Sequence, residues 1–405
     1  MKFAHIADCH VGGWRDPKLK NLTIDAFDKA IDQSIEKQVD FILISGDLFN
    51  SSIPDVSLLK RVVKKLKHVN KKQIPVYIIA GSHDFSPSGK TMLDVLEEAG
   101  LCINVVKGEV VENKLRLKFT VDEKTGAKIT GMIGKKGMLE KKFYENLDTK
   151  NLEQEAGFKI FMFHSALTEL KPKELEKMDS SPVSYLPKGF NYYAGGHVHI
   201  VKDVSLEGYK NIVYPGPVFP NNFSELEKLE KGGFFFYEDG KTSFNPIQVK
   251  NVFSLRINAN NKTPEQINQE IIDEIKNKEF IDTIVLLRIL GKLETGKTTD
   301  IDFKRIYSML YNKSAFFVMK NTYSLKTKEF DDIKIMHSEI DEIEDTLIDE
   351  QANGENIESW DLKKEKSMIR QLMTSFNLDK KEGEKVYEYQ ERILKEAAKL
   401  LDIEL

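Results

Sequence analysis

The sequence predicts an α/β protein in which a parallel sheet flanked by helices is followed by a smaller α+β unit and two C-terminal helices. Through the first third of the chain, short apolar runs alternate with longer amphipathic stretches, as in strands joined by helical crossovers. The middle has apolar runs with shorter, glycine-rich connections, and a new pattern begins near Val252. A length of 405 residues, of which 40% are hydrophobic, fits two or three folded domains.

The first third is expected to form the parallel sheet, because each apolar run is followed by a helical pattern. Strands are predicted at Lys2–Ala7, Asp40–Ser45 and Pro75–Ala80, and helices at Leu19–Lys37, Val56–Val69 and Met92–Ala99. The middle is expected to form a second, more mixed sheet that packs on the first. Its strands are predicted at Lys128–Ile133, Lys159–Phe163, Tyr192–Ala194, Asn211–Tyr214 and Gly233–Tyr237.

A small α+β unit is predicted from Val252 to about Ser324. It has strands at Phe253–Ile257 and Thr283–Ile289 and a helix at Pro264–Asn277 between them. An acidic stretch follows that has no Lys or Arg over Ser338–Glu358, which indicates a solvated linker. The predicted divisions of the chain are therefore 1–250, 251–325, 326–358 and 359–405.

The last division is predicted to form two amphipathic helices. The first carries an apolar stripe at helical spacing, made of Ile369, Leu372, Met373 and Phe376. Asp379 with Glu382 resembles a capping box at the start of the second helix, whose apolar face is Val386, Tyr389, Ile393, Ala397 and Leu400. Two such helices cannot bury both faces by themselves, so we expect them to dock on another surface.

Composition excludes several classes of protein. The formal net charge of −4 argues against a generally basic DNA-coating protein, so contacts with nucleic acid must come from local patches or bound metal ions. Two cysteines, Cys9 and Cys102, are too few for a disulfide framework or a structural zinc site. Neither a signal peptide nor a membrane-spanning apolar stretch is predicted. A cytoplasmic protein that does not enter membranes is therefore expected.

Histidines and aspartates gather where predicted strands end. The groups are Asp8-Cys9-His10, Gly46-Asp47, Gly81-Ser82-His83-Asp84, His164 and Gly195-Gly196-His197-Val198-His199. The carboxyl ends of strands in an open α/β sheet converge on one crevice. Side chains two residues apart in an extended chain point to the same side, which holds for Asp8 with His10 and for His197 with His199.

These residue types favour an open catalytic site for a transition metal. Imidazole nitrogens mixed with carboxylate oxygens suit Mn²⁺, Fe²⁺ or Zn²⁺, and there is no cysteine cage. Two ions about 3.5–4 Å apart can hold a phosphodiester between them. Asp47 is the candidate for a carboxylate shared by both ions. His5 lies inside a predicted strand and is expected to be a packed core residue, and Cys9 is expected to be buried.

The motifs resemble those of the calcineurin-like metallophosphoesterases, and within them the SbcD-type, or meiotic-recombination-eleven-type, double-strand-break-repair nucleases. The segments that carry this resemblance are MKFAHIADCHVGG at the start, SGDLFNSSIPD around Asp47, YYAGGHVH, and YPGP at Tyr214–Pro217 followed by KGGFFF. The resemblance implies a four-layer α/β/β/α sandwich over 1–250, a DNA-binding capping domain over 251–325, and a helical segment over 359–405.

The resemblance also implies a role for each site residue. One metal ion, expected to be Mn²⁺ like the second, would be held by Asp8, His10, Asp47 and His199, and the other by Asp47, Ser82, His164 and His197. His83 would protonate the leaving oxygen or stabilise the transition state, and Asp84 would orient it.

The sequence departs from the family pattern at one ligand. The family has Gly-Asn-His-Asp where this chain has Gly-Ser-His-Asp, so Ser82 offers a hydroxyl in place of an amide carbonyl. Three functions stay open at this point. The first is a Mn²⁺-dependent DNA exonuclease and endonuclease, the second is a phosphoesterase for nucleotides or small phosphate esters, and the third is a scaffold whose second ion is weakened by Ser82.

Partners follow from the resemblance as well. A nuclease of this family would act on DNA ends in double-strand-break repair, in the cytoplasm at the nucleoid. It would bind an SbcC-type coiled-coil ATPase through Ile369–Leu401 and form a homodimer.

Overall fold

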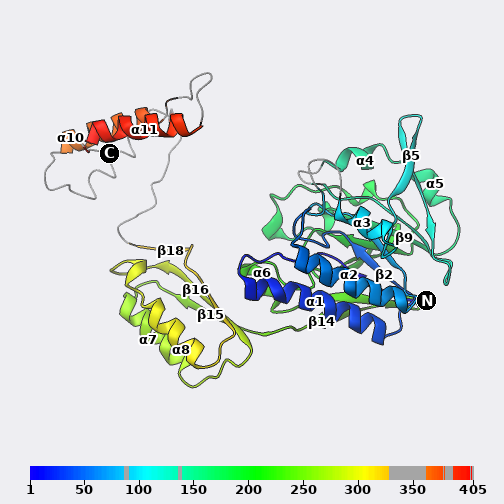
Figure 1. Cartoon of the computed structure of the whole chain (residues 1–405), viewed down its shortest axis with the longest axis horizontal. Coiled ribbons are helices and arrows are strands. Elements are labelled where there is room, and N and C mark those ends of the chain that lie inside the picture. The colour runs from blue at the N-terminus through cyan, green and yellow to red at the C-terminus, as the bar shows by residue number, and fades with distance from the viewer. Residues whose placement is uncertain are drawn as a thin grey trace. The chain divides into compact units, whose positions relative to one another are not determined.

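Figure 1 shows the computed structural model, which describes residues 1–85, 91–135, 139–327, 362–376, 378, 386–401 and 403. The described residues divide into two compact units. One contains residues 1–257, 269–289 and 302–322, and the other contains 258–268, 290–301 and the described residues from 323 onwards. Among the described helices, none combines the length and apolar character needed to cross a membrane.

The first of two six-stranded sheets has the order β14-β13-β1-β2-β3-β4. Its parallel strands are β1 (Lys2–Ile6), β2 (Phe41–Ser45), β3 (Val76–Ile79) and β4 (Ile103–Asn104). As predicted, helices follow the first three: α1 (Pro17–Glu36), α2 (Val56–Lys71) and α3 (Met92–Glu98). The antiparallel edge is made of β13 (Gly232–Glu238) and β14 (Lys241–Ile247).

The placement of β13 corrects one prediction. Gly233–Tyr237 was expected in the second sheet, but this segment pairs with β1, where Phe235 lies opposite His5. The pattern of an apolar run shows that it is a strand and does not say which sheet receives it. The chain returns from the second sheet through α6 (Phe223–Leu229) and adds β13 beside β1.

The second sheet has the order β11-β12-β10-β9-β8-β7. Its strands are β7 (Thr120–Val121), β8 (Lys128–Gly131), β9 (Lys159–His164), β10 (Tyr192–Gly196), β11 (Lys202–Leu206) and β12 (Tyr209–Tyr214). The outermost pairings of β7 and β11 are antiparallel and the inner ones parallel, so the sheet is mixed as predicted. A separate hairpin, β5 (Lys107–Val111) with β6 (Lys114–Lys118), and helices α4 (Lys141–Glu145) and α5 (Thr149–Glu153) were not predicted.

The side chains of each strand contribute in turn to an inner and an outer apolar cluster, because successive side chains of a strand point to opposite faces of its sheet. The two sheets share the inner cluster, and each has its own outer cluster. The cluster between the sheets contains Phe3, Phe41, Leu43, Ile160, Met162 and Tyr192. The outer cluster of the first sheet contains Ile42 and Ile44 with residues of α1 and α2. The outer cluster of the second contains Phe161 and Phe163 with Tyr144 of α4 and Leu152 of α5. The expected four-layer α/β/β/α sandwich is therefore confirmed.

The small α+β segment has four strands, with β16 (Thr283–Lys292) paired to β15 (Asn251–Asn258), β17 (Phe317–Asn321) and β18 (Leu325–Lys326). Its helices are α7 (Pro264–Ile275) and α8 (Phe303–Asn312). The predicted strands and the first helix are present, while α8, β17 and β18 had not been located from the sequence.

The predicted C-terminal helices are α10 (Leu362–Phe376) and α11 (Val386–Leu401), which pack against each other. Ala397 and Ala398 are buried, whereas Phe376 and Leu394 are exposed. The proposed capping pair, Asp379 and Glu382, lies outside the described residues, as does the acidic linker from residue 328 to 358. The four-part division of the chain stays a prediction.

Two expectations about single residues are confirmed. His5 is fully buried, and its Nδ1 lies 3.0 Å from the hydroxyl of Tyr192. Cys9 is also fully buried and is a free thiol.

Candidate metal centre

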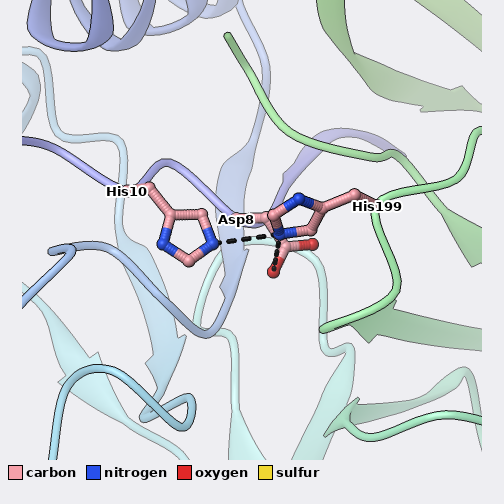
Figure 2. A group of neighbouring side chains, drawn as sticks. All are labelled: Asp8, His10 and His199. Carbon is pink, nitrogen blue, oxygen red and sulfur yellow. Dashed lines mark hydrogen bonds and ion pairs between the residues drawn. The ribbon is translucent and has the colours of Figure 1, made fainter. Parts of the chain in front are cut away.

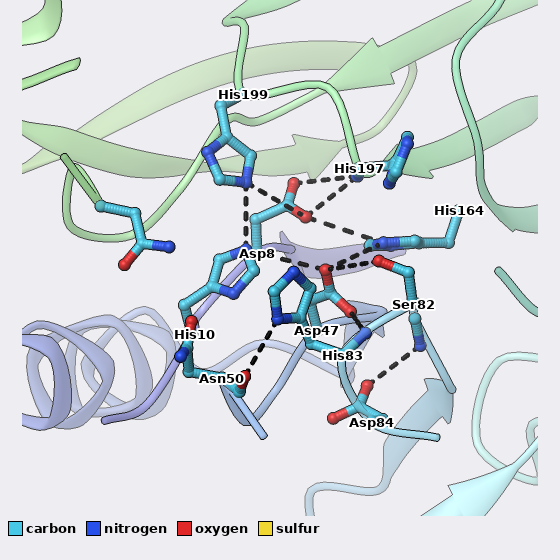
Figure 3. A network of polar contacts seen from close by, with 12 residues as sticks. Asp8, His10, Asp47, Asn50, Ser82, His83, Asp84, His164, His197 and His199 are labelled. Atoms are coloured by element: carbon cyan, nitrogen blue, oxygen red, sulfur yellow. Dashed lines mark hydrogen bonds and ion pairs between the residues drawn. The ribbon is translucent and has the colours of Figure 1, made fainter. Parts of the chain in front are cut away.

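The predicted site residues meet at the carboxyl ends of strands from both sheets (Figure 3). Asp8 and His10 follow β1, Asp47 follows β2, and the segment Ser82–Asp84 follows β3. From the second sheet, His164 ends β9, and His197 and His199 follow β10. Most of these side chains are buried, with Asp8, His10, Asp47 and His164 each no more than 2% exposed.

One cluster joins Asp8, His10 and His199, whose candidate ligand atoms all lie within 4.8 Å of one another (Figure 2). The Nε2 atoms of His10 and His199 are 3.0 Å apart, and the Nε2 of His199 is 3.9 Å from Asp8 Oδ1. Two imidazole nitrogens and a carboxylate oxygen facing one point form a ligand set suited to a divalent transition metal.

A second cluster joins Asp8, Asp47 and His164. Asp47 Oδ2 is 3.2 Å from His164 Nε2 and 3.7 Å from His10 Nε2, so this carboxylate borders both clusters. The hydroxyl of Ser82 lies 3.4 Å from the same oxygen. Asp47 therefore lies next to candidate ligands of both clusters.

His164 shows most directly that the residues fit a cation. Its Nδ1 lies 2.8 Å from the carbonyl oxygen of Ser45, which can only accept, so Nδ1 carries the hydrogen. In the neutral ring, Nε2 then has a lone pair that faces the Asp47 carboxylate at 3.2 Å. Two lone-pair atoms at that distance repel each other unless a proton or a metal ion lies between them. Nε2 makes no hydrogen bond, which leaves it free for a metal.

The charges of the site are set by burial and by mutual contact. Burial lowers the pKa of His10 to about 3 and that of His197 to about 4, so both rings are neutral, as metal ligands must be. Burial raises the pKa of Asp8. Burial opposes ionisation of both members of the His164–Asp47 pair, but the attraction between their opposite charges outweighs it, raising the pKa of His164 to about 10 and lowering that of Asp47. The extra proton lies on Nε2 facing the carboxylate, which is the position that a bound cation would take in its place.

Three glycines make room for the His164 ring. A Cβ atom on Gly46, Gly134 or Gly196 would lie 2.2, 2.5 or 2.8 Å from an atom of this ring. Gly46 also has a φ of +88°, which side chains rarely adopt. The glycines of the Gly46-Asp47 and Gly195-Gly196-His197 motifs therefore shape the site as well as turn the chain.

His197 is placed differently from the other histidines. Its backbone N–H donates to both oxygens of Asp8, at 2.9 and 3.1 Å, and its ring packs edge-on against His164 at 5.1 Å. Neither His197 nor Ser82 belongs to the three-residue clusters found among the described residues.

The contact expected between Asp84 and His83 is not among the hydrogen bonds of the described residues. The Asp84 carboxylate instead accepts the backbone N–H groups of Phe49 and Gly81, at 3.1 and 3.0 Å. The Nδ1 of His83 lies 2.9 Å from the carbonyl oxygen of Asn50, which orients the ring. Asp84 thus links the loop that follows β2 to the loop that follows β3. Its burial, and then the nearby charge of Asp47, raise the pKa of the Asp84 carboxyl to about 7.

Sequence reasoning missed two groups that contact site histidines. One is the Asn50 carbonyl, which no side-chain pattern identifies. The other is Glu225 of α6, whose Oε1 lies 2.9 Å from His199 Nδ1. Asn222 and Glu225 have the spacing of an N-cap residue and its partner three residues later, and this spacing could have identified the start of α6.

Comparisons with known proteins agree with this geometry. Residues 1–201 match the family described as calcineurin-like phosphoesterase. The chain is 25% identical over 328 residues to the DNA double-strand break repair protein Mre11 of Archaeoglobus fulgidus, covering 76% of this chain and 72% of that protein. It is 30% identical over 267 residues to Mre11 of Methanococcus maripaludis, covering 61% and 66%.

Mre11 of Methanocaldococcus jannaschii is 29% identical over 302 residues, covering 69% of this chain and 75% of that protein. A solved structure of a dimetal phosphatase from Danio rerio covers 61% of this chain and 96% of its own, with 12% identity and a TM-score of 0.38, which is too low to carry a conclusion. Residues 1–201 therefore belong to the calcineurin-like phosphoesterases, and the chain is a homologue of the archaeal Mre11 proteins.

Proposed function

We propose that this chain is a two-metal DNA nuclease that uses Mn²⁺ to process DNA ends in double-strand-break repair. The observation that carries the proposal is the convergence of lone-pair atoms from both sheets on the Asp47 carboxylate. The names of the archaeal relatives supply the substrate and the pathway.

The proposed ligands of the first ion are Asp8, His10, Asp47 and His199, and those of the second are Asp47, Ser82, His164 and His197. When bound, a pair of such ions supplies charge stabilisation and activates water for attack on a phosphodiester. The protein holds the ligands rigidly: Ser45 fixes the His164 ring through its carbonyl, and two of the loops are tied together by Asp84.

His83 is the proposed proton carrier of the reaction. The Asn50 carbonyl keeps a hydrogen on Nδ1, so Nε2 is the atom at which this ring can gain or lose a proton. The ring packs at right angles to His10, with the centroids 4.8 Å apart, and is half-buried. This placement puts it beside the ligands, as suits a residue that donates a proton to the leaving oxygen.

The partner assignments belong to the same proposal. DNA ends are the proposed substrate, with the segment 251–325 as a capping domain that contacts DNA. The segment Ile369–Leu401 is proposed to bind a coiled-coil ATPase. Phe376 of α10 and Leu394 of α11 support this, because they are large apolar side chains exposed on amphipathic helices. Dimerisation and a cytoplasmic, nucleoid-associated location are proposed with them.

The test is cutting of linear duplex DNA with Mn²⁺, together with the number of bound ions measured by calorimetry. Asp8→Ala should lose both metal and activity, because Asp8 lies in two of the three clusters of candidate ligands, one with His10 and His199 and one with Asp47 and His164. His83→Ala should keep both ions and lose on the order of 10²–10⁴-fold in rate. His68→Ala, an exposed histidine on α2, is the matched control and should behave as the unchanged protein.

Two outcomes would favour one of the other candidate functions, and a third would overturn the role of a single residue. Turnover of a chromogenic phosphodiester without any cutting of DNA would favour a phosphoesterase for nucleotides or small phosphate esters. Binding of a single ion, with no hydrolysis, would favour a scaffold, since the Ser82 hydroxyl is a weaker ligand than the amide of the family pattern. Normal cutting by His83→Ala would overturn the role given to that histidine.

A further inference from the structure

Helix α6 brings a carboxylate against a proposed metal ligand from outside the site. Glu225 Oε1 lies 2.9 Å from Nδ1 of His199, and both side chains are about four-fifths buried, at 19% and 20% exposure. The carboxylate can only accept, so it holds the hydrogen of His199 on Nδ1. The Nε2 of that ring then keeps its lone pair, and this is the atom that faces Asp8 and His10.

The Glu225 carboxylate is itself held by several donors. The backbone N–H of Asn221 donates to Oε2 at 2.7 Å, and the side-chain amide of Asn222 donates to Oε1 at 2.6 Å. In return, the Asn222 oxygen accepts the backbone N–H of Glu225 at 2.9 Å. With the ring N–H of His199, three donors contact the two carboxylate oxygens, which fixes the orientation of the carboxylate. The fixed carboxylate in turn fixes the orientation of the His199 ring.

We propose that Glu225 is the positioning residue of His199, fixing both the hydrogen on Nδ1 and the ring plane so that Nε2 points at the first metal ion. The inference rests on the proposed two-metal function. A histidine ligand whose other nitrogen donates to a carboxylate is more basic and less free to rotate, and such partners are worth about 10–100-fold in metal affinity.

A simpler role must be separated from this one. Glu225 stands where a helix-capping partner stands, three residues after Asn222, and could serve only to begin α6. A capping residue affects the stability of the fold, whereas a positioning residue affects the affinity of the metal. The experiment therefore measures both quantities on the full chain.

The variants are Glu225→Ala and Glu225→Gln, with Glu227→Ala as the matched control. Glu227 lies on the same helix, and its carboxylate pairs with Arg288 at 2.8 Å where that of Glu225 contacts a histidine. Glutamine keeps the length of the side chain but has a single acceptor oxygen, so it cannot satisfy all three donors. Manganese affinity is measured by calorimetry and by the electron paramagnetic resonance of the bound ion, and stability by thermal unfolding with chelator.

Glu225→Ala should weaken Mn²⁺ binding at one of the two sites, the one that contains His199, by about 10–100-fold. The Mn²⁺ affinity of Glu225→Gln at that site should lie between those of Glu225→Ala and the unchanged protein. Glu227→Ala should bind Mn²⁺ normally. Unchanged Mn²⁺ affinity in Glu225→Ala, with a lower melting temperature, would overturn the inference and leave a capping role. If the unchanged protein bound no Mn²⁺, the proposed function itself would fail first, so the two failures are distinguishable.

Discussion

The slot that holds His164 can be tested by adding one methyl group at Gly134. This glycine follows β8, and its backbone N–H donates to the carbonyl of Ala80 at 2.9 Å, so it is fixed between the sheets. It is not among the residues with positive φ, and alanine therefore fits its backbone. The new Cβ would lie 2.5 Å from Cδ2 of the His164 ring and 2.6 Å from the His164 carbonyl oxygen.

The size of the effect follows from these distances. Carbon atoms approach each other to about 3.5 Å, so the ring must move by about 1 Å. A shift of that size breaks the 2.8 Å hydrogen bond from Nδ1 to the Ser45 carbonyl, because the two atoms then lie beyond hydrogen-bond distance. It also moves Nε2 away from Asp47. A misplacement of about 1 Å costs on the order of 10²-fold in rate, and overpacking costs about 1–3 kcal/mol of stability.

The assay compares Gly134→Ala with Gly131→Ala, which is crowded to a similar degree three residues earlier. A Cβ on Gly131 would lie 2.6 Å from the carbonyl oxygen of Met162, and its three nearest atoms all belong to Met162 and Ile79, neither of which is a site residue. Both variants should lose stability in urea unfolding. Gly134→Ala alone should lose one of two Mn²⁺ ions and about 10²-fold of its DNA-cutting rate. Equal metal binding and equal cutting by the two variants would refute the reasoning about the His164 slot.

Two further predictions concern single side chains. Ser82→Asn should raise the Mn²⁺ affinity of the second site by roughly tenfold, about 1.4 kcal/mol, because it places an amide oxygen near Asp47. Calorimetry measures this affinity, and an unchanged value would mean that residue 82 is not a ligand. His5→Gln should make stability less sensitive to acid. Burial lowers the pKa of His5 to about 3, from an ordinary value near 6.5. The unfolded chain therefore binds the proton first as pH falls, and the folded state loses about 2 kcal/mol between pH 7 and pH 5. Urea unfolding with chelator at both pH values should show the smaller loss in the variant; an equal loss would contradict the assignment.

The strands and helices of the first sheet could be predicted because their signals are local. Apolar runs of four or five residues followed by amphipathic stretches define β1 to β3 and α1 to α3 within a residue or two of their observed bounds. The short strands β4 and β7, the hairpin β5–β6 and the edge strands β11 and β14 carry little or no such pattern, since they are short, exposed or both. The partner of β13 could not be predicted for another reason. Its pairing with β1 depends on the path of the chain from the second sheet back to the first, which a local pattern does not reveal.

The sequence by itself determined which atoms are available for the site. Asp8, His10 and Asp47 stand at the ends of apolar runs of one sheet, whose parallel strands end at a common edge, so their gathering follows from spacing. His164 and His199 lie at or just beyond the ends of strands of the second sheet, and the packing of the two sheets brings them to the same place.

Only the tertiary structure decided which atom of each side chain faces the centre. That depends on the second nitrogen of each imidazole, whose partners are the Ser45 carbonyl, the Asn50 carbonyl and the Glu225 carboxylate. Two of these are backbone groups, which every residue has and no residue type reveals. The third lies on a separate helix, and a hydrogen bond between distant segments exists only once the chain has folded and brought them within about 3 Å.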